Sequence, residues 1–321
     1  MAKVLDGIRV LDFGRYVACP VAGAFLSDQG AEVIRVEKPG GEIDRELGPF
    51  APNGESFPYS LVNHRNKKAI TLNLDVEAGK RVFRDVVKHA DVVMDNFALG
   101  AKQAKGLTYD NLKKINPAII YVNITGFGST GPMAHRSSFD PGAQAMSGAM
   151  SFSGYPGNPP TRAALSWVDF ATGLSAALGT MYALYHRKAT GRGQMVDLSL
   201  LDTAVAMLGI MGVAAEAKVN NHLRPQIGSH SFCCFSDLFQ TKDGWIFVSG
   251  VTNNLWRRIA KVIGKPEWAT DPRFKDDMSR FNNKDIIVPA IQEWMSQRTS
   301  QQVTELLEAA LALEEGLGLV A

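Results

Sequence analysis

The sequence predicts an α/β fold: a mostly parallel sheet with flanking helices, accompanied by a smaller mixed α/β domain. The first half of the chain alternates short runs of β-branched residues with amphipathic segments, and strands that alternate with helices are joined by crossovers that keep them parallel. The chain has 321 residues, of which 45% are hydrophobic and 21% are charged. This is enough for one large α/β core and a second, smaller one.

Five short segments are expected to form the strands of the sheet: residues 8–14, 31–36, 69–74, 91–95 and 118–124. Helices are expected between strands at residues 20–29 and 109–115. A third helix is expected after Asp75, which would cap it. Its apolar face contains Val82, Phe83, Val86 and Val87. The sheet is expected to be Rossmann-like, but no G-x-G-x-x-G follows the first strand, so we do not expect NAD binding.

The second half contains longer helices and a predicted domain boundary. Residues 127–160 are rich in Gly, Ser and Pro and are expected to form loops near a functional site. The apolar segments 170–186 and 196–216 are expected to be buried helices. The chain turns polar around 220–231, which predicts a large domain over 1–222 and a small one over 223–321. In the small domain we expect a strand at 244–249 and helices at 254–263, 283–297 and 300–313.

Composition and cysteine usage exclude several classes of protein. The formal net charge is +2 and no long Lys/Arg run is present, so we expect no nucleic-acid partner. Cys19, Cys233 and Cys234 have no C-x-x-C spacing, which predicts reduced thiols in the cytoplasm and no bound metal. The N-terminus lacks the apolar run of a signal peptide. The most apolar stretch, 198–215, contains Asp202 and is expected to be a buried helix and not a membrane span.

Asp169 has two interpretations from its local sequence. It directly precedes an Ala/Gly/Leu-rich segment, where an aspartate most often caps a helix by accepting hydrogen bonds from first-turn amides. The same place also suits chemistry, because the helix dipole favours the ionised carboxylate while Trp167 and Phe170 surround it with apolar groups. An ionised, poorly solvated carboxylate can attack an activated carbonyl.

A set of sequence fragments decides between the two interpretations. They are GAEVIRVEKPG (30–40), NHRNKK (63–68), DNF (95–97), GFGSTGP (126–132), SWVDFATG (166–173), TGRGQMVDLSLLD (190–202) and DPRF (271–274). In this order and spacing, essentially the whole chain resembles the class III CoA-transferases of the CaiB/BaiF type. That superfamily includes formyl-CoA transferase, carnitine CoA-transferase and α-methylacyl-CoA racemase. The resemblance implies a large Rossmann-like domain that binds coenzyme A, and a homodimer.

The resemblance also implies a covalent mechanism on Asp169. In the transferases of this family an aspartate attacks the thioester of a donor acyl-CoA and forms an acyl-aspartyl anhydride. The released thiolate attacks the aspartyl carbonyl, which frees the donor acid and leaves an aspartyl-CoA thioester. The acceptor acid reverses these steps. The implied partners are an acyl-CoA and a small carboxylic acid, with coenzyme A as substrate and no prosthetic group or metal.

Residues of the CoA site are implied position by position. Lys38 and Lys105 match basic residues that meet the CoA phosphates. The other matched positions are Val17, Ala18, Leu72, Asn73, Asn96, Phe97, Ala98, Phe139 and Asp140. Lysine keeps the charge of the arginine that is usual at position 38 but loses its bidentate geometry.

Three departures from the family pattern bear on the activity. The racemases have a histidine at the position of Phe139, and because a phenyl ring cannot carry a proton, CoA transfer is favoured over racemisation. Formyl-CoA transferases have a run of glycines where this chain has 249–254 with one glycine. Oxalate-using members have a tryptophan at the position of Gly48, although Tyr59 is retained; both differences suggest a larger acid. The family's C-terminal return segment is expected to be missing after 311–321. An α-methylacyl-CoA racemase or epimerase, or a truncated non-catalytic CoA-binding homologue, are the alternatives.

Overall fold

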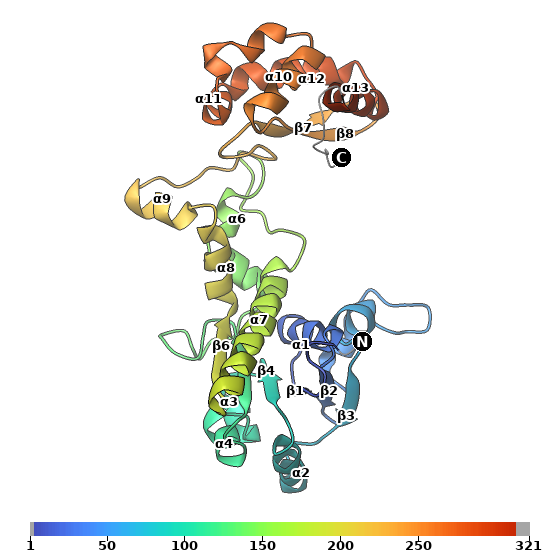
Figure 1. Cartoon of the computed structure of the whole chain (residues 1–321), viewed down its shortest axis with the longest axis vertical. Helices are drawn as coiled ribbons and strands as arrows, with labels where there is room; N and C mark the ends of the chain where they lie inside the picture. Colours follow the sequence, from blue (N-terminus) through green and yellow to red (C-terminus); the bar gives the residue numbers. More distant parts are fainter. Residues whose placement is uncertain (1–2, 313–321) are drawn as a thin grey trace. The chain divides into compact units, whose positions relative to one another are not determined.

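The computed structural model describes residues 3–312, and these fall into two compact units (Figure 1). The first unit contains residues up to 151 together with 161–224, and the second contains 152–160 together with residues from 225 on. The C-terminal segment that departs from the family pattern lies, from residue 313 on, outside the described residues. The assignment of CoA binding to residues 1–222 stays a prediction.

The first unit is built on a six-stranded sheet in which all neighbours are parallel. Its strand order is β3-β2-β1-β4-β5-β6, which is the order of a doubly wound Rossmann sheet. The strands are β1 (Arg9–Asp12), β2 (Glu32–Glu37), β3 (Lys68–Thr71), β4 (Val92–Asp95), β5 (Ile120–Thr125) and β6 (Met195–Ser199). The predicted α/β class is confirmed, and each of the five predicted strands overlaps an observed one.

The sixth strand corrects one prediction. The helix predicted over 196–216 is wrong at its start, because β6 occupies these residues and pairs with β5. Val196 and Leu198 flank Asp197, so both apolar side chains pack on the core side of the sheet. Helical structure begins only at α8 (Leu200–Gly209), where the Ser199 hydroxyl accepts a hydrogen bond from the Asp202 amide at 2.9 Å. The long apolar run that follows makes the short apolar–polar alternation of β6 difficult to recognise in the sequence.

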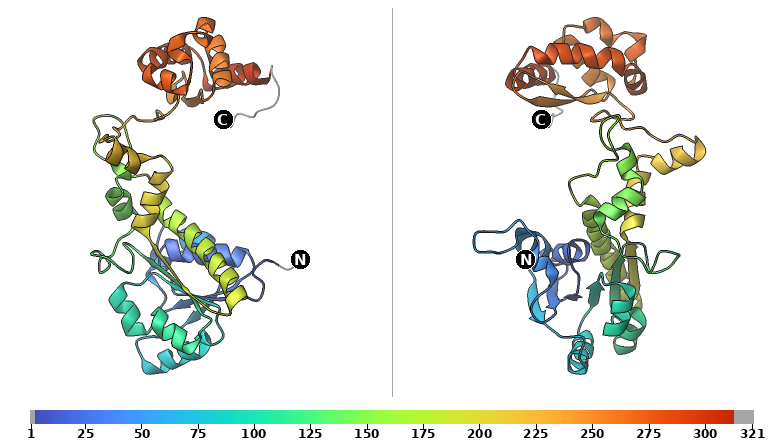
Figure 2. Two further views of the ribbon diagram at one scale, coloured as in Figure 1. Left: turned by 60° about the vertical axis from the view of Figure 1, so that its left-hand side comes forward. Right: turned by 180° about the vertical axis from the view of Figure 1, so that it is seen from behind.

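Helices cover both faces of the sheet (Figure 2). One layer contains α1 (Ala18–Asp28) and α7 (Trp167–Thr190), and the other contains α2 (Glu77–Val87), α3 (Leu99–Lys105) and α4 (Tyr109–Ile115). Alternate residues of a strand serve the two layers: Val92 and Met94 pack with α1 and α7, whereas Val93 packs with α2. Buried strands of this kind read as continuous apolar runs, which is why the sequence reveals them.

Two local predictions are corrected by the structure. Residues 127–160 are not all loop, because α5 (Asp140–Met146) and the short α6 (Ala149–Phe152) form within them; the proline in the first turn of α5 suits a helix start. Asp75 does not cap α2. That helix has Val76 at its N-cap position, and the Asp75 carboxylate pairs with the ammonium of Lys105.

The apolar stretch 198–215 also differs from its prediction. It is divided into α8 and α9 (Val213–Val219), and Ile210 and Met211 are 80% and 48% exposed, so the expected burial is not found in the single chain. Within residues 3–312 no single helix is long and apolar enough to cross a membrane. Only α8 and α9 taken together, across a 77° bend, meet that length and composition.

The second unit combines a β-hairpin with a group of helices. The hairpin is formed by β7 (Ser236–Gln240) and β8 (Trp245–Ser249), which are antiparallel. The helices are α10 (Asn253–Val262), α11 (Asp277–Asn282), α12 (Lys284–Ser296) and α13 (Ser300–Ala312). Phe235, Trp256 and Phe274 are the centre of its core. The predicted strand and the three predicted helices of this unit are observed, whereas the first strand of the hairpin and α11 were not predicted from the sequence.

Candidate active site

The candidate site lies at the carboxyl ends of β1 and β4, where the strand order of the sheet reverses. Loops that follow two such strands diverge and leave a crevice, which is the usual ligand site of an open parallel sheet. A cavity of about 240 Å³ occurs here. The predicted site residues that line it are Val17, Ala18, Asn96, Phe97, Ala98, Phe139 and Asp169.

The loop after β1 is held in place by two buried polar side chains. Asp12 accepts a hydrogen bond from the Gly14 amide at 2.8 Å, and Gly14 has no room for a side chain, because a Cβ would lie 2.6 Å from Cys19. Tyr16 then has a φ of 62°, which is uncommon for an aromatic residue. Its carbonyl accepts a hydrogen bond from Nδ2 of Asn63 at 2.6 Å. These contacts fix the turn that enters α1.

The loop after β4 is tied to the loop after β1. Asn96 Oδ1 accepts a hydrogen bond from the Arg15 amide at 2.7 Å, and Asn96 Nδ2 donates to the Arg15 carbonyl at 2.8 Å. The Arg15 guanidinium lies 4.3 Å from the centre of the Phe97 ring and 2.8 Å from the carboxylate of Glu42. The two loops therefore form one edge of the cavity, and Arg15 is the cationic residue among those that line it.

Asp169 lies in the first turn of α7 but does not cap it. The N-cap residue Ser166 makes no side-chain capping bond. Asp140 supplies the cap from α5: its Oδ2 accepts hydrogen bonds from the amides of Val168 at 2.8 Å and Asp169 at 3.2 Å. Among residues 3–312 the Asp169 carboxylate has no hydrogen-bond or ion-pair partner. Because another carboxylate carries out the capping, the side chain of Asp169 is left free to react.

Burial leaves the Asp169 carboxylate poorly solvated and shifts its pKa. Burial raises the pKa of Asp169 to about 7, and the negative charge of Asp140 adds to this effect. Desolvation disfavours the charged form, so Asp169 is protonated in a substantial fraction of the molecules at neutral pH. A carboxylate that is ionised with little solvation is a better nucleophile than one in water. A strongly shifted pKa in a cleft is also typical of a functional group.

A second residue of α5 supports Asp140. Gln144 donates from Nε2 to Asp140 at 2.5 Å and to the Leu165 carbonyl at 3.2 Å. Its Oε1 accepts a hydrogen bond from the Ala163 amide at 3.0 Å. Asp140 and Gln144 are both 1% exposed. Together they hold the chain segment that leads into Asp169.

The remaining predicted CoA residues lie outside the cavity lining. Lys38 is exposed, and Lys105 is paired with Asp75. Leu72 packs partly buried against the core beneath α2. Asn73 accepts a hydrogen bond from the Asp75 amide at 2.9 Å. These four positions and Asp140 stay predictions as contacts of CoA.

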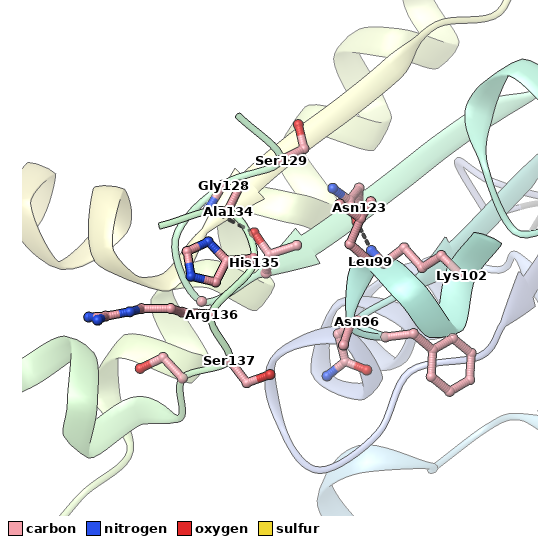
Figure 3. Close-up of a pocket in the computed structure, with 15 residues that line it drawn as sticks. Asn96, Leu99, Lys102, Asn123, Gly128, Ser129, Ala134, His135, Arg136 and Ser137 are labelled. Carbon is pink, nitrogen blue, oxygen red and sulfur yellow. Dashed lines mark hydrogen bonds between the residues drawn. The ribbon is translucent and has the colours of Figure 1, made fainter. Parts of the chain in front are cut away.

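A smaller cavity of about 80 Å³ adjoins the first and shares with it the residues from Asn96 to Ala98 (Figure 3). Lys102 extends from α3 into this region and contacts Asn123 on β5. Its ammonium also lies 3.0 Å from the carboxylate of Asp95. Lys102 is 4% exposed. This places a buried ammonium at the wall of the smaller cavity.

Sequence reasoning missed several residues of the site. Arg15 and Tyr16 precede the predicted Val17, and the rule that ligands meet the loops at the carboxyl ends of parallel strands would have included them. Lys102 has the appearance of an ordinary surface lysine, and only the packing of α3 on the sheet shows its burial. Among residues 3–312 no group of three or more His, Cys, Asp or Glu side chains is arranged to hold a metal.

Comparisons with known proteins fit this geometry. Residues 5–314 match the model of CoA-transferase family III. The chain is 34% identical, over 95% of its length and 76% of the relative's, to succinyl-CoA–D-citramalate CoA-transferase of Chloroflexus aurantiacus. It is 36% identical, over 95% of its length and 78% of the relative's, to acetyl-CoA:oxalate CoA-transferase of Acetobacter aceti.

Solved structures agree with these sequence relatives. A crystal structure of a CaiB/BaiF family protein from Brucella suis is similar with a TM-score of 0.84 and 31% identity, over 96% of this chain and 82% of that one. The agreement extends over both units of the chain. The chain belongs to CoA-transferase family III, a family of enzymes.

Proposed function

We propose that this enzyme transfers coenzyme A from an acyl-CoA donor to a small free carboxylic acid through covalent intermediates on Asp169. The observation that carries the proposal is the state of this side chain. Its carboxylate lines the cavity without a hydrogen-bond partner among residues 3–312, while Asp140 caps α7 in its place. A carboxylate with only a structural role at a helix start would accept those amide hydrogen bonds itself.

The proposed reaction has four displacements at carbonyl carbons. An Asp169 oxygen attacks the donor thioester carbonyl, and the C–S bond breaks to give the anhydride and CoA thiolate. The thiolate attacks the aspartyl carbonyl and releases the donor acid as its carboxylate, leaving aspartyl-CoA. The acceptor carboxylate then attacks the aspartyl carbonyl and expels the thiolate. Finally the thiolate attacks the acceptor's carbonyl, which forms the new acyl-CoA and regenerates Asp169.

The position of Asp169 on α7 also stabilises the negative charge that develops during the reaction. The first-turn position on α7 places the positive end of the helix dipole near the oxygens that gain charge as each carbonyl is attacked. The cavity wall is apolar around Val17, Ala18 and Leu200, so the electrostatic interaction is weakly screened. In this proposal Asp140 is a positioning residue that acts through the backbone of α7.

For CoA itself we propose the path along the two loops of the cavity. Asn96, Phe97 and Ala98 line both cavities, which suits a long substrate that follows this edge. Lys38 and Lys105 are proposed to meet its phosphates. Lys105 would exchange its exposed partner Asp75 for phosphate, and an exposed ion pair of this kind is worth roughly 1 kcal/mol or less.

We further propose that the acids are short dicarboxylic acids. The relatives named above act, by their names, on citramalate and oxalate with succinyl-CoA or acetyl-CoA as donor, and a mouse relative acts on succinyl-CoA and glutarate. Such an acid has one carboxylate to react at Asp169 and a second that favours a cation. Arg15 lines the same cavity and is suited to carboxylate recognition.

A homodimer in the cytoplasm completes the proposal. On α7 the side chains of Leu174, Leu178, Tyr182 and Tyr185 are 52%, 51%, 64% and 79% exposed. Their spacing of three or four residues makes them one stripe on the helix. A continuous exposed apolar stripe on a long helix is typical of a subunit interface. The three cysteines are free thiols, as expected of a reducing compartment.

Trapping the intermediate tests the reaction. We expect acid quenching of the enzyme with donor acyl-CoA, followed by tryptic digestion and mass spectrometry, to find coenzyme A or the acyl group on peptide 163–187. Asp169 is the only acidic side chain in that peptide. Borohydride should convert the aspartyl thioester to homoserine at this position. An adduct confined to another peptide would disprove the assignment.

Asp140 offers a test through pH. Because the charge of Asp140 contributes to the raised pKa of Asp169, Asp140→Asn is expected to lower the pH at which kcat/KM for the donor is half-maximal. Activity should rise with pH in both enzymes, since the ionised carboxylate attacks, with the wild-type midpoint at about 7. The pH profile is the measurement. An unchanged midpoint in Asp140→Asn would contradict the electrostatic role.

A further inference from the structure

Two aromatic rings meet at the wall of the Asp169 cavity. The centres of the Tyr16 and Phe139 rings are 5.1 Å apart at an angle of 84°, which is a favourable edge-to-face arrangement. Both residues line the cavity that contains Asp169. Tyr16 lies in the loop after β1, and Phe139 is the residue directly before α5. The pair therefore joins the two sides of the site.

The backbone holds each ring in position. Tyr16 has a φ of 62°, a conformation that costs an aromatic residue free energy unless its surroundings impose it. Buried Asn63 imposes it through the hydrogen bond to the Tyr16 carbonyl. Phe139 is followed directly by Asp140, whose carboxylate is anchored on the first turn of α7. The residue next to the ring is therefore bound to the helix turn that presents Asp169.

Packing of the core does not explain the position of Phe139. Its side chain is 59% exposed, and its ring contacts that of Tyr16. A large apolar ring that is kept at the wall of a reactive cavity, while the neighbouring residue is 1% exposed, points to a role in the cavity.

The proposed reaction supplies a reason for such a wall. Both covalent intermediates can be intercepted by water. If water attacks the aspartyl carbonyl of aspartyl-CoA, the C–S bond breaks, the thiolate takes up a proton and Asp169 returns as a carboxylate. The net result is hydrolysis of the donor thioester to acid and free CoA. An active site for transfer must therefore exclude water while admitting a second acid.

We propose that the Tyr16–Phe139 ring pair is the water-excluding wall of the Asp169 site and sets the partition between CoA transfer and hydrolysis. This inference rests on the proposed function. The two rings act as a unit, because each is supported by the other across the cavity edge.

The partition of products tests the pair. In one reaction with donor acyl-CoA and acceptor acid, free thiol measures hydrolysis and the new acyl-CoA measures transfer. We expect Phe139→Ala and Tyr16→Gly each to raise the ratio of hydrolysis to transfer about tenfold. Glycine accepts the φ of Tyr16 without strain, so that variant keeps the loop. The double variant should exceed neither single variant by more than about twofold, since either change opens the same wall.

Matched controls separate the pair from general damage. Phe139→Leu and Tyr16→Phe keep apolar bulk and should stay within about twofold of the wild-type ratio. Trp245→Ala removes a ring that is 60% exposed on β8 and does not line the cavity, and it should leave the ratio unchanged. A wild-type ratio in both cavity variants, or a change in KM for the acid alone, would overturn the inference while the Asp169 adduct persists. Absence of that adduct in the wild type would overturn both the inference and the proposed function.

Discussion

Asp169→Asn is expected to lower kcat/KM for CoA transfer by about 10⁴-fold or more, because the side chain that forms both intermediates is removed. Asparagine has nearly the same shape and leaves the backbone amide at 169 bonded to Asp140. CoA binding is therefore expected to stay within about threefold of wild type, as measured by calorimetry. The rate is measured by the appearance of product acyl-CoA, and the adduct on peptide 163–187 should disappear.

Stability provides the control for this variant. The pKa of Asp169 is raised to about 7 in the folded protein, against 3.8 ordinarily. The folded state therefore binds more protons between these values, and stability falls as pH rises from about 4 to 7. Asp169→Asn removes this loss, so it should be more stable than wild type at pH 8 by roughly 2–4 kcal/mol. The difference should vanish near pH 4 in urea unfolding. A variant that is inactive because it is unfolded would instead be less stable than wild type at pH 8.

Transfer by Asp169→Asn near the wild-type rate would show that Asp169 is not the nucleophile. Slow transfer with a trapped adduct on another carboxylate would show that this other carboxylate is the nucleophile. The Asp169→Ala variant distinguishes deamidation of asparagine from true residual activity, because alanine cannot be converted back to aspartate.

The fold was largely predictable because buried parallel strands leave continuous apolar runs. Val92, Val93 and Met94 are each 0% exposed, and such a run has few alternatives to a central strand. The β6 strand was not predictable in the same way, since Val196 and Leu198 are only partly buried and are followed at once by an apolar helix. Pairing with β5, which lies far away in the sequence, decides the conformation there.

The site was predictable where one residue carries one chemical role. Asp169 stands out by motif, but the division of labour between Asp169 and Asp140 depends on two amide hydrogen bonds that join residues 28 and 29 positions apart. No local pattern contains that information. The conformation of Tyr16 is similar: the sequence shows a tyrosine, whereas the φ of 62° follows from buried neighbours.

A second large effect is expected from the buried ion pair beneath the site. Lys67 Nζ lies 2.7 Å from Asp12 Oδ2 and donates to the Pro20 carbonyl at 2.7 Å. Lys67→Met is expected to destabilise the protein by about 3–5 kcal/mol, because Asp12 at 0% exposure then keeps, among residues 3–312, the Arg35 guanidinium 3.9 Å away as its ion-pair partner. Urea unfolding at pH 7 measures this loss.

Lys68→Met is the matched control, since Lys68 pairs with Glu32 at the same 2.7 Å distance. That pair is exposed, with side-chain exposures of 72% and 34%, and its loss should cost about 1 kcal/mol or less. Equal losses in the two variants would contradict the dependence on burial. Because Asp12 also holds the Gly14 amide, Lys67→Met, but not Lys68→Met, should disturb the turn that leads to Tyr16 and raise KM for the donor acyl-CoA. A destabilised Lys67→Met enzyme with an unchanged KM would show that the turn holds its shape without the pair.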